Sequence, residues 1–506
     1  MKKNSQQKRT QIFKKFKKSI KRRLKKKRYK NQAKPIMTGK NIHYELSDKT
    51  RAMSYGGLGA IHKMVKQIGL DQELDDCLKL LKVHLPYHES DHVLNLAYNA
   101  LVGGKRLEDI ELRRNDEAYL DALGAQRIPD PTTAGDFTRR FENKEDNVLL
   151  MDGINHARER VWSKAPRGFM NEAILDVDGT LAETLGECKQ GMDISYNGIW
   201  GYHPLIISLA NTNEVLYLVN RSANVPSHEG AAEWIDKAIE LVSAHSKKTF
   251  LRGDTDFSLT SHFDRWSERV NFVFGMDACA PFVSKAEGLG EACWEPLERE
   301  PKYQVRTQER EKPENVKERI VKERNFKNIR LASEQVAEFE YRPVKCKKTY
   351  RMVVVRENLS VEKGEMALFD DIRYFFYITT RRDLTAAEIV EQANKRCNQE
   401  NVISQLKNGV NAMRMPVQDL ESNWAYMIMT ALAWNLKAWF GLLMPNRIRR
   451  TQVLKMEFRR FLQMFILIPC QIVRTGRKIV YRLLSYNEAL KDFFDTFERI
   501  RRLQFE

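Results

Sequence analysis

The stretch Glu172-Ala173-Ile174-Leu175-Asp176-Val177-Asp178-Gly179-Thr180 is an apolar run that ends in two carboxylates beside a glycine. A second stretch, Phe250-Leu251-Arg252-Gly253-Asp254-Thr255-Asp256, has the same form. Each predicts a short buried strand with an aspartate at its end, where solvent, substrate and metal can reach it. The surrounding sequence predicts strands at 172–178, 205–211, 215–221, 248–254 and 271–276, with a helix near 230–245. Three strands, a helix and then further strands indicate an α/β core.

A third acidic position follows much later in the chain. Arg396, Glu400 and Lys407 are separated by offsets that place all three on one face of a single helix, with the acid between two cations. By itself, an Arg396–Glu400 pair is common on surface helices and contributes only a few tenths of a kcal/mol. The two upstream strands that end in aspartate favour a functional interpretation of Glu400.

The ordered set of strand aspartate, strand aspartate and helix glutamate resembles the D-D-E core of bacterial insertion-sequence transposases. One branch of that family has the signature Y-x-x-R-x-x-x-E-x6-K, which this chain matches at Arg396, Glu400 and Lys407, while Ala393 stands at the tyrosine position. The segment Gly201-Tyr202-His203-Pro204-Leu205 is similar to the G-Y-H-P-L segment of one subgroup. The resemblance implies an α/β fold, in which a ribonuclease H-like catalytic core is interrupted by a β-rich insertion and flanked by helical regions.

The resemblance also implies a site that binds Mg²⁺, with Mn²⁺ as an alternative, through Asp178, Asp254 and Glu400. Hard carboxylate oxygens are the ligands that these ions prefer, and two such ions can activate a nucleophile and stabilise a leaving oxygen at a phosphodiester. Asp176 and Asp178 share a strand face, and the family pattern, with its acid two residues before the threonine, favours Asp178. Asp254 is likewise favoured over Asp256.

Four cations are candidate DNA contacts. Arg396 and Lys407 are expected to bind DNA phosphates near the metal site. Arg139 and Arg140 follow Pro131 in a helix predicted through Phe141. This helix and the one at 92–101 are consistent with a DNA-binding helix-turn-helix or with a plain helical bundle that exposes both arginines, and the sequence leaves both open.

The formal charge of +18 is concentrated at the N-terminus, where residues 1–34 contain seventeen lysines and arginines and no acid. Such a segment repels itself and can displace the counterions of a polyanion. We expect a disordered arm that binds DNA. The interval between Asp254 and Glu400 exceeds what the core requires, so we place the insertion there. The expected domains are an arm at 1–40, a helical DNA-binding domain at 41–165, core segments at 166–285 and 373–415 around an insertion at 286–372, and a helical region at 416–506.

Other classes of protein are disfavoured. Seven cysteines without a C-x-x-C pair argue against structural zinc or a disulfide framework, and for a reducing cytoplasm. The most apolar window, Trp424–Met444, contains Asn435 and Lys437 and predicts a buried helix, with its tryptophans in the core, better than a membrane span. No phosphate-binding G-x-x-x-x-G-K-[ST] loop is present, so we expect no nucleotide cofactor.

Two other residues have alternative interpretations. His203, beside Tyr202, invites a role as general base, but a structural role is favoured. Trp294 could stack on an unpaired base near a cleaved end, although core packing is favoured.

The function expected from the resemblance is a transposase, acting at the bacterial nucleoid, that binds its element's ends as a homodimer, cleaves double-stranded DNA and joins the ends to a target. The alternatives are a ribonuclease H-like nuclease without strand transfer and a DNA-binding derivative without catalysis.

Overall fold

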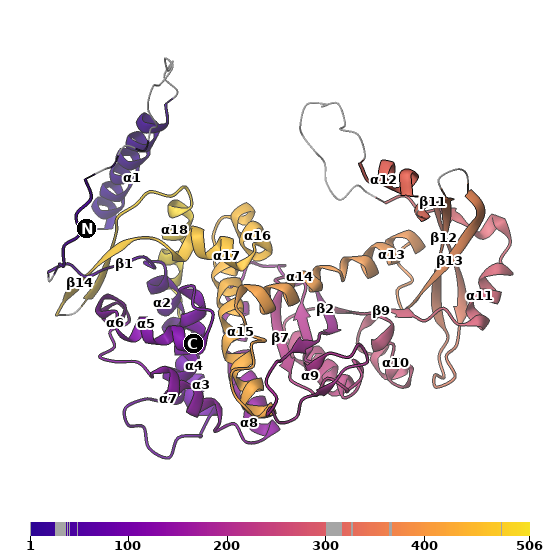
Figure 1. The fold of residues 1–506 in the computed structure, drawn as a ribbon, viewed down its shortest axis with the longest axis horizontal. Coiled ribbons are helices and arrows are strands. Elements are labelled where there is room, and N and C mark those ends of the chain that lie inside the picture. Colours follow the sequence, from indigo (N-terminus) through magenta and orange to yellow (C-terminus); the bar gives the residue numbers. More distant parts are fainter. Residues whose placement is uncertain are drawn as a thin grey trace. The chain divides into compact units, whose positions relative to one another are not determined.

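The computed structural model describes residues 2–25, 37, 39, 41–47, 49–299, 316–324, 327–363, 367–476 and 478–505. The chain divides into two compact units. The first unit comprises Met1–Ala165 with Gln405–Glu506, and the second unit comprises Pro166–Ser404. Figure 1 labels their elements.

The second unit is built around a large sheet. Its strands are β2 (Glu172–Gly179), β3 (Ala182–Glu183), β4 (Asp193–Ile194), β5 (Trp200–Tyr202), β6 (Leu205–Leu209), β7 (Glu214–Val219), β8 (Lys248–Gly253), β9 (Asn271–Met276), β10 (Glu295–Pro296), β11 (Lys327–Tyr341), β12 (Tyr350–Lys363) and β13 (Ala367–Thr379). Its α-helices are α9 (Ala231–Ser243), α10 (Thr260–Trp266), α11 (Ala280–Glu287), α12 (Val316–Arg324), α13 (Ala386–Lys395) and α14 (Asn398–Ser404).

Nine of these strands form one mixed sheet in the order β10-β11-β12-β13-β9-β8-β2-β6-β7. Strand β2 lies parallel to β8, and β8 lies parallel to β9. The other neighbouring pairs are antiparallel. The strands predicted around the two aspartates and the helix near 230–245 are therefore confirmed, with boundaries that differ by a few residues.

Helices cover both faces of this sheet around β2. Val177 of β2 pairs with Ile207 of β6, and Ile207 pairs with Tyr217 of β7. The Tyr217 ring contacts Trp234 of α9. Helix α9 therefore covers the face to which Val177 points. Ile174 points to the opposite face, where it packs against the buried cluster that joins α13 to the strands. Asp176 and Asp178 alternate with Val177, so they lie on the α13 side.

The expected insertion does not form a separate sheet. Strands β11, β12 and β13 continue the central sheet through pairing of Phe376 with Met276 of β9. The boundary expected at 372/373 falls inside β13, because the backbone pairing of β13 with β12 continues through both Ile372 and Arg373. Residues 300–315, also within the expected insertion, lie outside the described residues.

The sequence predicts one helix for Arg396, Glu400 and Lys407, and the structure corrects this prediction. Helix α13 ends at Lys395, Arg396 is its C-cap, and α14 begins at Asn398. The chain then changes to a π-helix at Gln405–Gly409, which contains Lys407 and belongs to the first unit. Because wider π-helical turns and a helix end alter the rotation per residue, offsets of four and eleven no longer define one face.

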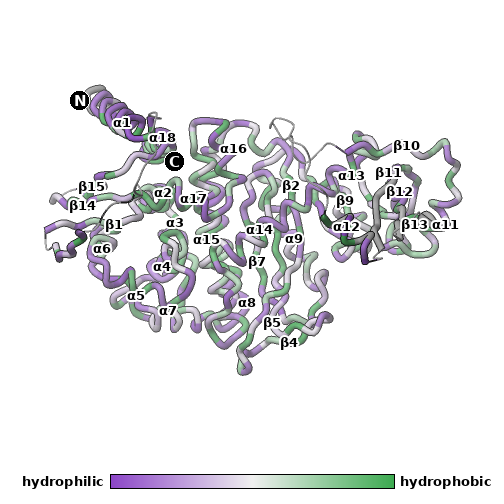
Figure 2. The backbone as a smooth tube through the Cα atoms, turned by 45° about the horizontal axis from the view of Figure 1, so that its top comes forward, coloured by the Kyte–Doolittle hydropathy of each residue, from purple (hydrophilic) through white to green (hydrophobic). Residues whose placement is uncertain are grey.

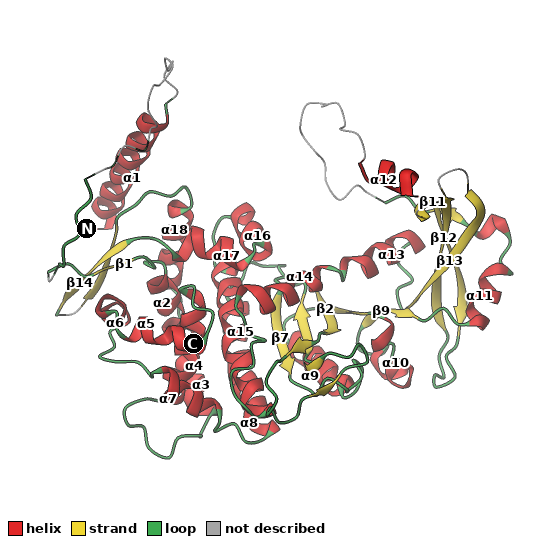
Figure 3. Cartoon of the chain, in the orientation of Figure 1, coloured by secondary structure: helices red, strands yellow, loops and turns green. Residues whose placement is uncertain are grey.

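The first unit is mainly helical, as Figure 3 shows. Its α-helices are α1 (Lys2–Leu24), α2 (Leu58–Ile68), α3 (Leu70–Cys77), α4 (Glu89–Leu101), α5 (Ile110–Arg114), α6 (Glu117–Leu123), α7 (Pro131–Thr138), α8 (Lys144–Ser163), α15 (Leu420–Leu442), α16 (Arg447–Lys455), α17 (Phe458–Phe461) and α18 (Leu490–Arg501). Its strands are β1 (Ala52–Met53), β14 (Cys470–Thr475) and β15 (Lys478–Leu483).

Helix α15 lies at the centre of this unit. It packs against α4, α7, α8 and α16, and nearly all of its residues are buried. Trp424, Trp434 and Trp439 are core residues, as the sequence favoured. None of the helices in the described part of the chain is both long enough and apolar enough to cross a membrane.

The arm expected to be disordered is helical over Lys2–Leu24, which corrects that prediction; residues 26–36 lie outside the described residues. Lysine, arginine and glutamine have good helix propensity. Phe13 and Phe16 are half-buried at helical spacing, and the Phe13 ring meets Phe494 of α18 with centroids 5.6 Å apart. Figure 2 shows α1 as mostly hydrophilic. This apolar contact stabilises the helix despite the charge on its other faces.

The C-terminal region expected to be helical contains a β-hairpin, a second correction. Strands β14 and β15 pair antiparallel, and β14 also pairs with β1. Burial alternates in β14, where Cys470 and Ile472 are buried while Gln471 and Val473 are partly exposed, and this period of two suits a strand with one packed face rather than a helix. All seven cysteines are free, consistent with the absence of a disulfide framework.

Candidate active site

The two aspartates of β2 have different surroundings. Asp176 is 1% exposed and accepts two hydrogen bonds from Arg252, one from Nε at 2.6 Å and one from Nη2 at 2.8 Å. The parallel register places these two residues directly opposite each other on β2 and β8. Arg252 also donates from Nη1 to the Gln392 carbonyl of α13 at 3.1 Å. Asp176 is therefore part of a buried ion pair that joins the two strands to a helix.

Asp178 and Asp254 converge on one guanidinium at the ends of neighbouring parallel strands. Arg396 Nη1 donates to Asp178 Oδ2 at 3.0 Å, and Arg396 Nη2 lies 3.8 Å from Asp254 Oδ2. The side chains of Asp178 and Arg396 are each 16% exposed, and that of Asp254 is 33% exposed. The site is thus desolvated but open to a ligand.

Burial changes the acidity of both carboxyls. Burial raises the pKa of Asp178 to about 6, and the nearby Asp254 carboxylate adds to this rise while Arg396 opposes it. The pKa of Asp254 is also raised, chiefly by burial. Two carboxylates that are destabilised in their charged forms have a strong electrostatic preference for a nearby cation.

Two glycines allow the strands to end at these aspartates. A Cβ on Gly179 would lie 2.8 Å from His203 Nε2, and one on Gly253 would lie 2.9 Å from both Phe257 and Phe274. Beyond Gly253, Asp254 caps a short 3₁₀ turn by accepting from the Asp256 amide at 3.1 Å. Asp256 itself is exposed. The local chain thus directs Asp254, rather than Asp256, toward Arg396.

Glu400 stands beside a residue that fixes α14 to the sheet. Gln399 is 1% exposed and donates from Nε2 to the Asp176 and Ile206 carbonyls, both at 3.0 Å. The side chain of Glu400 is exposed and makes no hydrogen bond or ion pair within the described residues. The three acids are not among the groups in the described part of the chain whose ligand atoms lie within 4.8 Å of one another. The structure therefore brings Asp178 and Asp254 together, with Glu400 on the adjoining helix.

The donor set fits a divalent cation. Asp178 and Asp254 supply hard oxygen atoms, which suit Mg²⁺ and Mn²⁺. Among the described residues, Arg396 is the one cation that pairs with them, so the two carboxylates keep excess negative charge. Nitrogen and sulfur ligands that would favour zinc are absent from this set of residues.

The remaining predicted contacts lie in the first unit. Lys407 is half-buried in the π-helical segment. Arg139 and Arg140 are exposed beyond the end of α7, and Arg139 pairs with Asp136 at 2.7 Å. Helices α5 and α6 intervene between α4 and α7, so the helix-turn-helix hypothesis is wrong for this pair. The helix predicted through Phe141 ends at Thr138.

Three aromatic or imidazole residues lie in packed positions. Tyr202 donates to the Gln190 carbonyl at 2.8 Å, and the His203 Nδ1 atom lies 2.9 Å from the Val225 carbonyl. Trp294 is 7% exposed beneath the Arg356 guanidinium, 4.3 Å from its ring centroid. These contacts agree with the structural roles that the sequence favoured.

Sequence reasoning missed Arg252 and Gln399. The two strand sequences contain a signal for the pairing of Arg252 with Asp176. Each residue lies two positions before the acid at the end of its own strand, so a parallel alignment of the two strands places them opposite each other. Gln399 gives no such pattern, because its partners are backbone carbonyls of strands far away in the sequence.

Residues 34–505 match the family described as transposase DDE domain group 1. No curated protein matches the chain. Among solved structures, a cryo-EM structure of the piggyBac transposase synaptic complex with hairpin DNA is 11% identical, with a TM-score of 0.34 over 82% of this chain and 82% of that chain. That likeness is too low to support an argument. The family match includes β2, β8 and α14 with their three acids and spans nearly all of the sequence, so the chain belongs to the transposases with a DDE domain of group 1.

Proposed function

We propose that the protein is the transposase of a bacterial insertion sequence, which binds the terminal inverted repeats of its own element and catalyses Mg²⁺-dependent DNA cleavage and strand transfer. The family supports transposition of DNA. The observation on which the proposal depends is the convergence of Asp178 and Asp254 on Arg396 at the ends of β2 and β8.

The catalytic core in this proposal is ribonuclease H-like. Its support is the topology of five strands, in which β7, β6 and β2 are antiparallel neighbours and β2, β8 and β9 are parallel neighbours. Helix α9 connects the antiparallel group to β8 along the chain. Strands β10–β13 are the proposed insertion.

In the proposed mechanism, Asp178, Asp254 and Glu400 hold the metal ions. Bound Mg²⁺ supplies activation of a water or 3′-hydroxyl nucleophile and stabilisation of the leaving oxygen. Arg396 partly offsets the charge of the two aspartates before metal binds and would then donate instead to a phosphate oxygen of DNA. Lys407 is a proposed phosphate contact. Asp176 and Arg252 keep β2 and β8 aligned, so that the two strand ends remain side by side.

The proposed partners are double-stranded DNA, both at the element ends and at the target, and a second copy of the chain. Arg139, Arg140 and the basic helix α1 are proposed contacts to DNA phosphates, and the protein would act at the nucleoid. No nucleotide cofactor is part of the proposal.

The test is cleavage and strand transfer with purified protein, a DNA duplex that contains the element end, a target plasmid and Mg²⁺. We expect Asp178→Asn, Asp254→Asn and Glu400→Gln each to reduce cleavage by at least about 10³-fold while DNA binding persists, because each removes a ligand charge with little change in size. The matched control is Asp256→Asn, which changes an exposed aspartate two residues from Asp254 and should retain activity.

Cleavage at the wild-type rate by all three variants would contradict the proposed site. Cleavage without joined products from the wild-type chain would instead support a nuclease without strand transfer. Binding without cleavage by the wild-type chain in Mg²⁺ and in Mn²⁺ would support a catalytically inactive DNA-binding derivative.

A further inference from the structure

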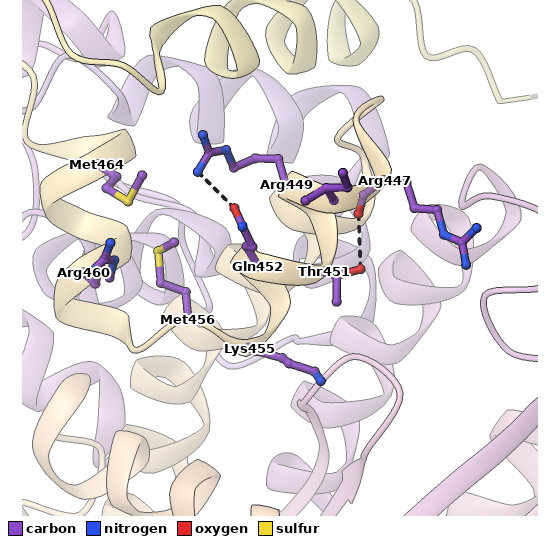
Figure 4. Close-up of a pocket in the computed structure, with 9 residues that line it drawn as sticks. Arg447, Arg449, Thr451, Gln452, Lys455, Met456, Arg460 and Met464 are labelled. Carbon is purple, nitrogen blue, oxygen red and sulfur yellow. Dashed lines mark hydrogen bonds between the residues drawn. The ribbon is translucent and has the colours of Figure 1, made fainter. Parts of the chain in front are cut away.

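The first unit has a basic surface that includes none of the residues assigned above. Helices α16 and α17 and the π-helical segment Leu462–Ile466 surround an open cavity of about 870 Å³ (Figure 4). Four of the residues that line it are cations, and none is an acid: Arg447, Arg449, Lys455 and Arg460. We call these side chains, with Ile448, Thr451 and Gln452, the α16 surface.

Most of this positive charge has no counter-charge. Arg449 pairs with Asp492 of α18 at 3.1 Å. The side chains of Arg447, Lys455 and Arg460 are exposed and make no ion pair or hydrogen bond within the described part of the chain. Glu457, the nearest acid in the sequence, is not part of the cavity wall. Unpaired cations gathered in one hollow favour a polyanionic partner.

Five of these side chains lie on one face of helix α16. Positions 447, 448, 451, 452 and 455 follow helical spacing, while Val453 and Leu454 on the other side are buried. With its side chains, an α-helix is about 10 to 12 Å across. The major groove of B-DNA is about 12 Å wide and admits an α-helix. The dimensions of the exposed face therefore suit double-stranded DNA.

Buried contacts hold α16 in place. Lys437 of α15 is 0% exposed and donates to the Leu454 carbonyl at 3.0 Å, which satisfies a carbonyl in the last turn of α16. At the other end, Arg450 donates to the Met444 carbonyl at 2.7 Å. A helix fixed at both ends can offer its exposed face with little loss of conformational entropy on binding.

The chemistry of the face includes groups that contact bases as well as phosphates. Gln452 accepts from Arg449 Nη1 at 3.0 Å, which orients its amide, as the dashed line in Figure 4 shows. Glutamine pairs with adenine and arginine with guanine in the major groove, and threonine can contact either bases or a thymine methyl group. Lysine is a point charge suited to phosphate.

We propose that the α16 surface enters the major groove of double-stranded DNA, with Arg447, Thr451 and Gln452 at base edges and Lys455 and Arg460 on phosphates. This inference rests on the proposed function in that it takes the element's DNA as the partner. It adds a sequence-reading surface that does not include the catalytic acids.

The experiment measures binding of the full-length chain by fluorescence anisotropy without divalent metal, so that the result does not depend on cleavage. The probes are a duplex selected from a random pool by the wild-type chain and a scrambled duplex of equal length, over a range of salt concentrations. Gln452→Ala should reduce discrimination between them by about 5- to 150-fold. The double variant Lys455→Gln, Arg460→Gln should weaken both complexes alike and lower the salt slope by about 2.

Arg459→Gln is the matched control, because Arg459 is exposed on α17 but does not line the cavity, and it should leave discrimination unchanged. Circular dichroism and a thermal melt check that each variant folds. Unchanged discrimination in Gln452→Ala together with an unchanged salt slope in the double variant would overturn the proposal. So would equal competition by single-stranded RNA or a polyglutamate peptide. If either of these outcomes is found while Asp178→Asn still abolishes cleavage, the α16 proposal fails but the proposed function stands.

Discussion

At the scale of the residue, burial raises the pKa of two aspartates separated by one valine, and the two differ in their partners. Asp176 is buried and is held by two hydrogen bonds from Arg252. Asp178 is less buried, is repelled by Asp254, and has a pKa raised to about 6 from its ordinary 3.8. Carboxyl groups whose charged form is destabilised by burial are concentrated at functional sites, where the carboxylate binds a cation or a substrate.

The first prediction is that Asp178→Asn stabilises the protein at neutral pH while abolishing cleavage. Since the folded-state pKa is raised, the protonated carboxyl favours the folded state below pH 3.8, and that contribution is lost as the pH rises through about 6. Asparagine cannot ionise, so we expect a gain of about 1 to 3 kcal/mol at pH 7.5 that disappears below pH 3.8. Chemical denaturation without divalent metal at both pH values measures it.

The control for this prediction is Asp176→Asn, the same substitution at the paired position. It leaves the Arg252 guanidinium buried without its counter-charge, so we expect a loss of about 3 to 5 kcal/mol at pH 7.5. If both variants lose stability at that pH, the assignment of Asp176 to structure and Asp178 to function is wrong.

At the scale of the element, the break between α13 and α14 decides which side chains meet. Because the helix ends at Lys395, Arg396 turns toward Asp178 and Asp254 rather than toward Glu400. Gln399 then fixes α14 on β2 and β6 through two backbone carbonyls. The position of Glu400 therefore depends on its neighbour and on the sheet.

The second prediction follows from that attachment. Gln399→Leu removes both hydrogen bonds and leaves two buried carbonyls without these donors, at a cost of about 1 to 3 kcal/mol. It should lower the cleavage rate constant more than the affinity for DNA, because it displaces Glu400 and not the DNA-binding surfaces. Single-turnover cleavage and anisotropy separate the two effects. Asn398→Ala, at an exposed adjacent position, should leave both near wild type, and equal loss of rate in the two variants would argue against a positioning role for Gln399.

At the scale of the whole molecule, the positive charge is concentrated in residues 1–34, of which the structure describes α1. The lysines Lys14, Lys17 and Lys21 lie together along α1, where they line one open hollow. A helix with such a face can follow phosphates without reading bases, since phosphate contacts contain no base information.

The third prediction is that replacing these three lysines by glutamine weakens binding to every DNA sequence and lowers the slope of log affinity against log salt by about 2 to 3. Discrimination between sequences should not change. The control replaces three exposed lysines elsewhere, Lys82, Lys345 and Lys347, which gives the same net charge. An equal change in slope for both triple variants would show that net charge, and not α1, is responsible.

The sequence by itself determined the strands that end in Asp178 and Asp254, the buried helix α15 and the order of the three acids. Alternating apolar runs and strand-end glycines are local properties, so their meaning does not depend on distant residues. The sequence did not determine that β13 joins β9, that α13 ends at Lys395, or that Cys470–Leu483 forms a hairpin. Pairing between strands and the end of a helix depend on partners far away in the chain, as Gln399 and Arg252 illustrate. Only the tertiary structure brought Asp178, Asp254 and Arg396 into contact, because burial, repulsion and ion pairing arise only once distant elements are packed together.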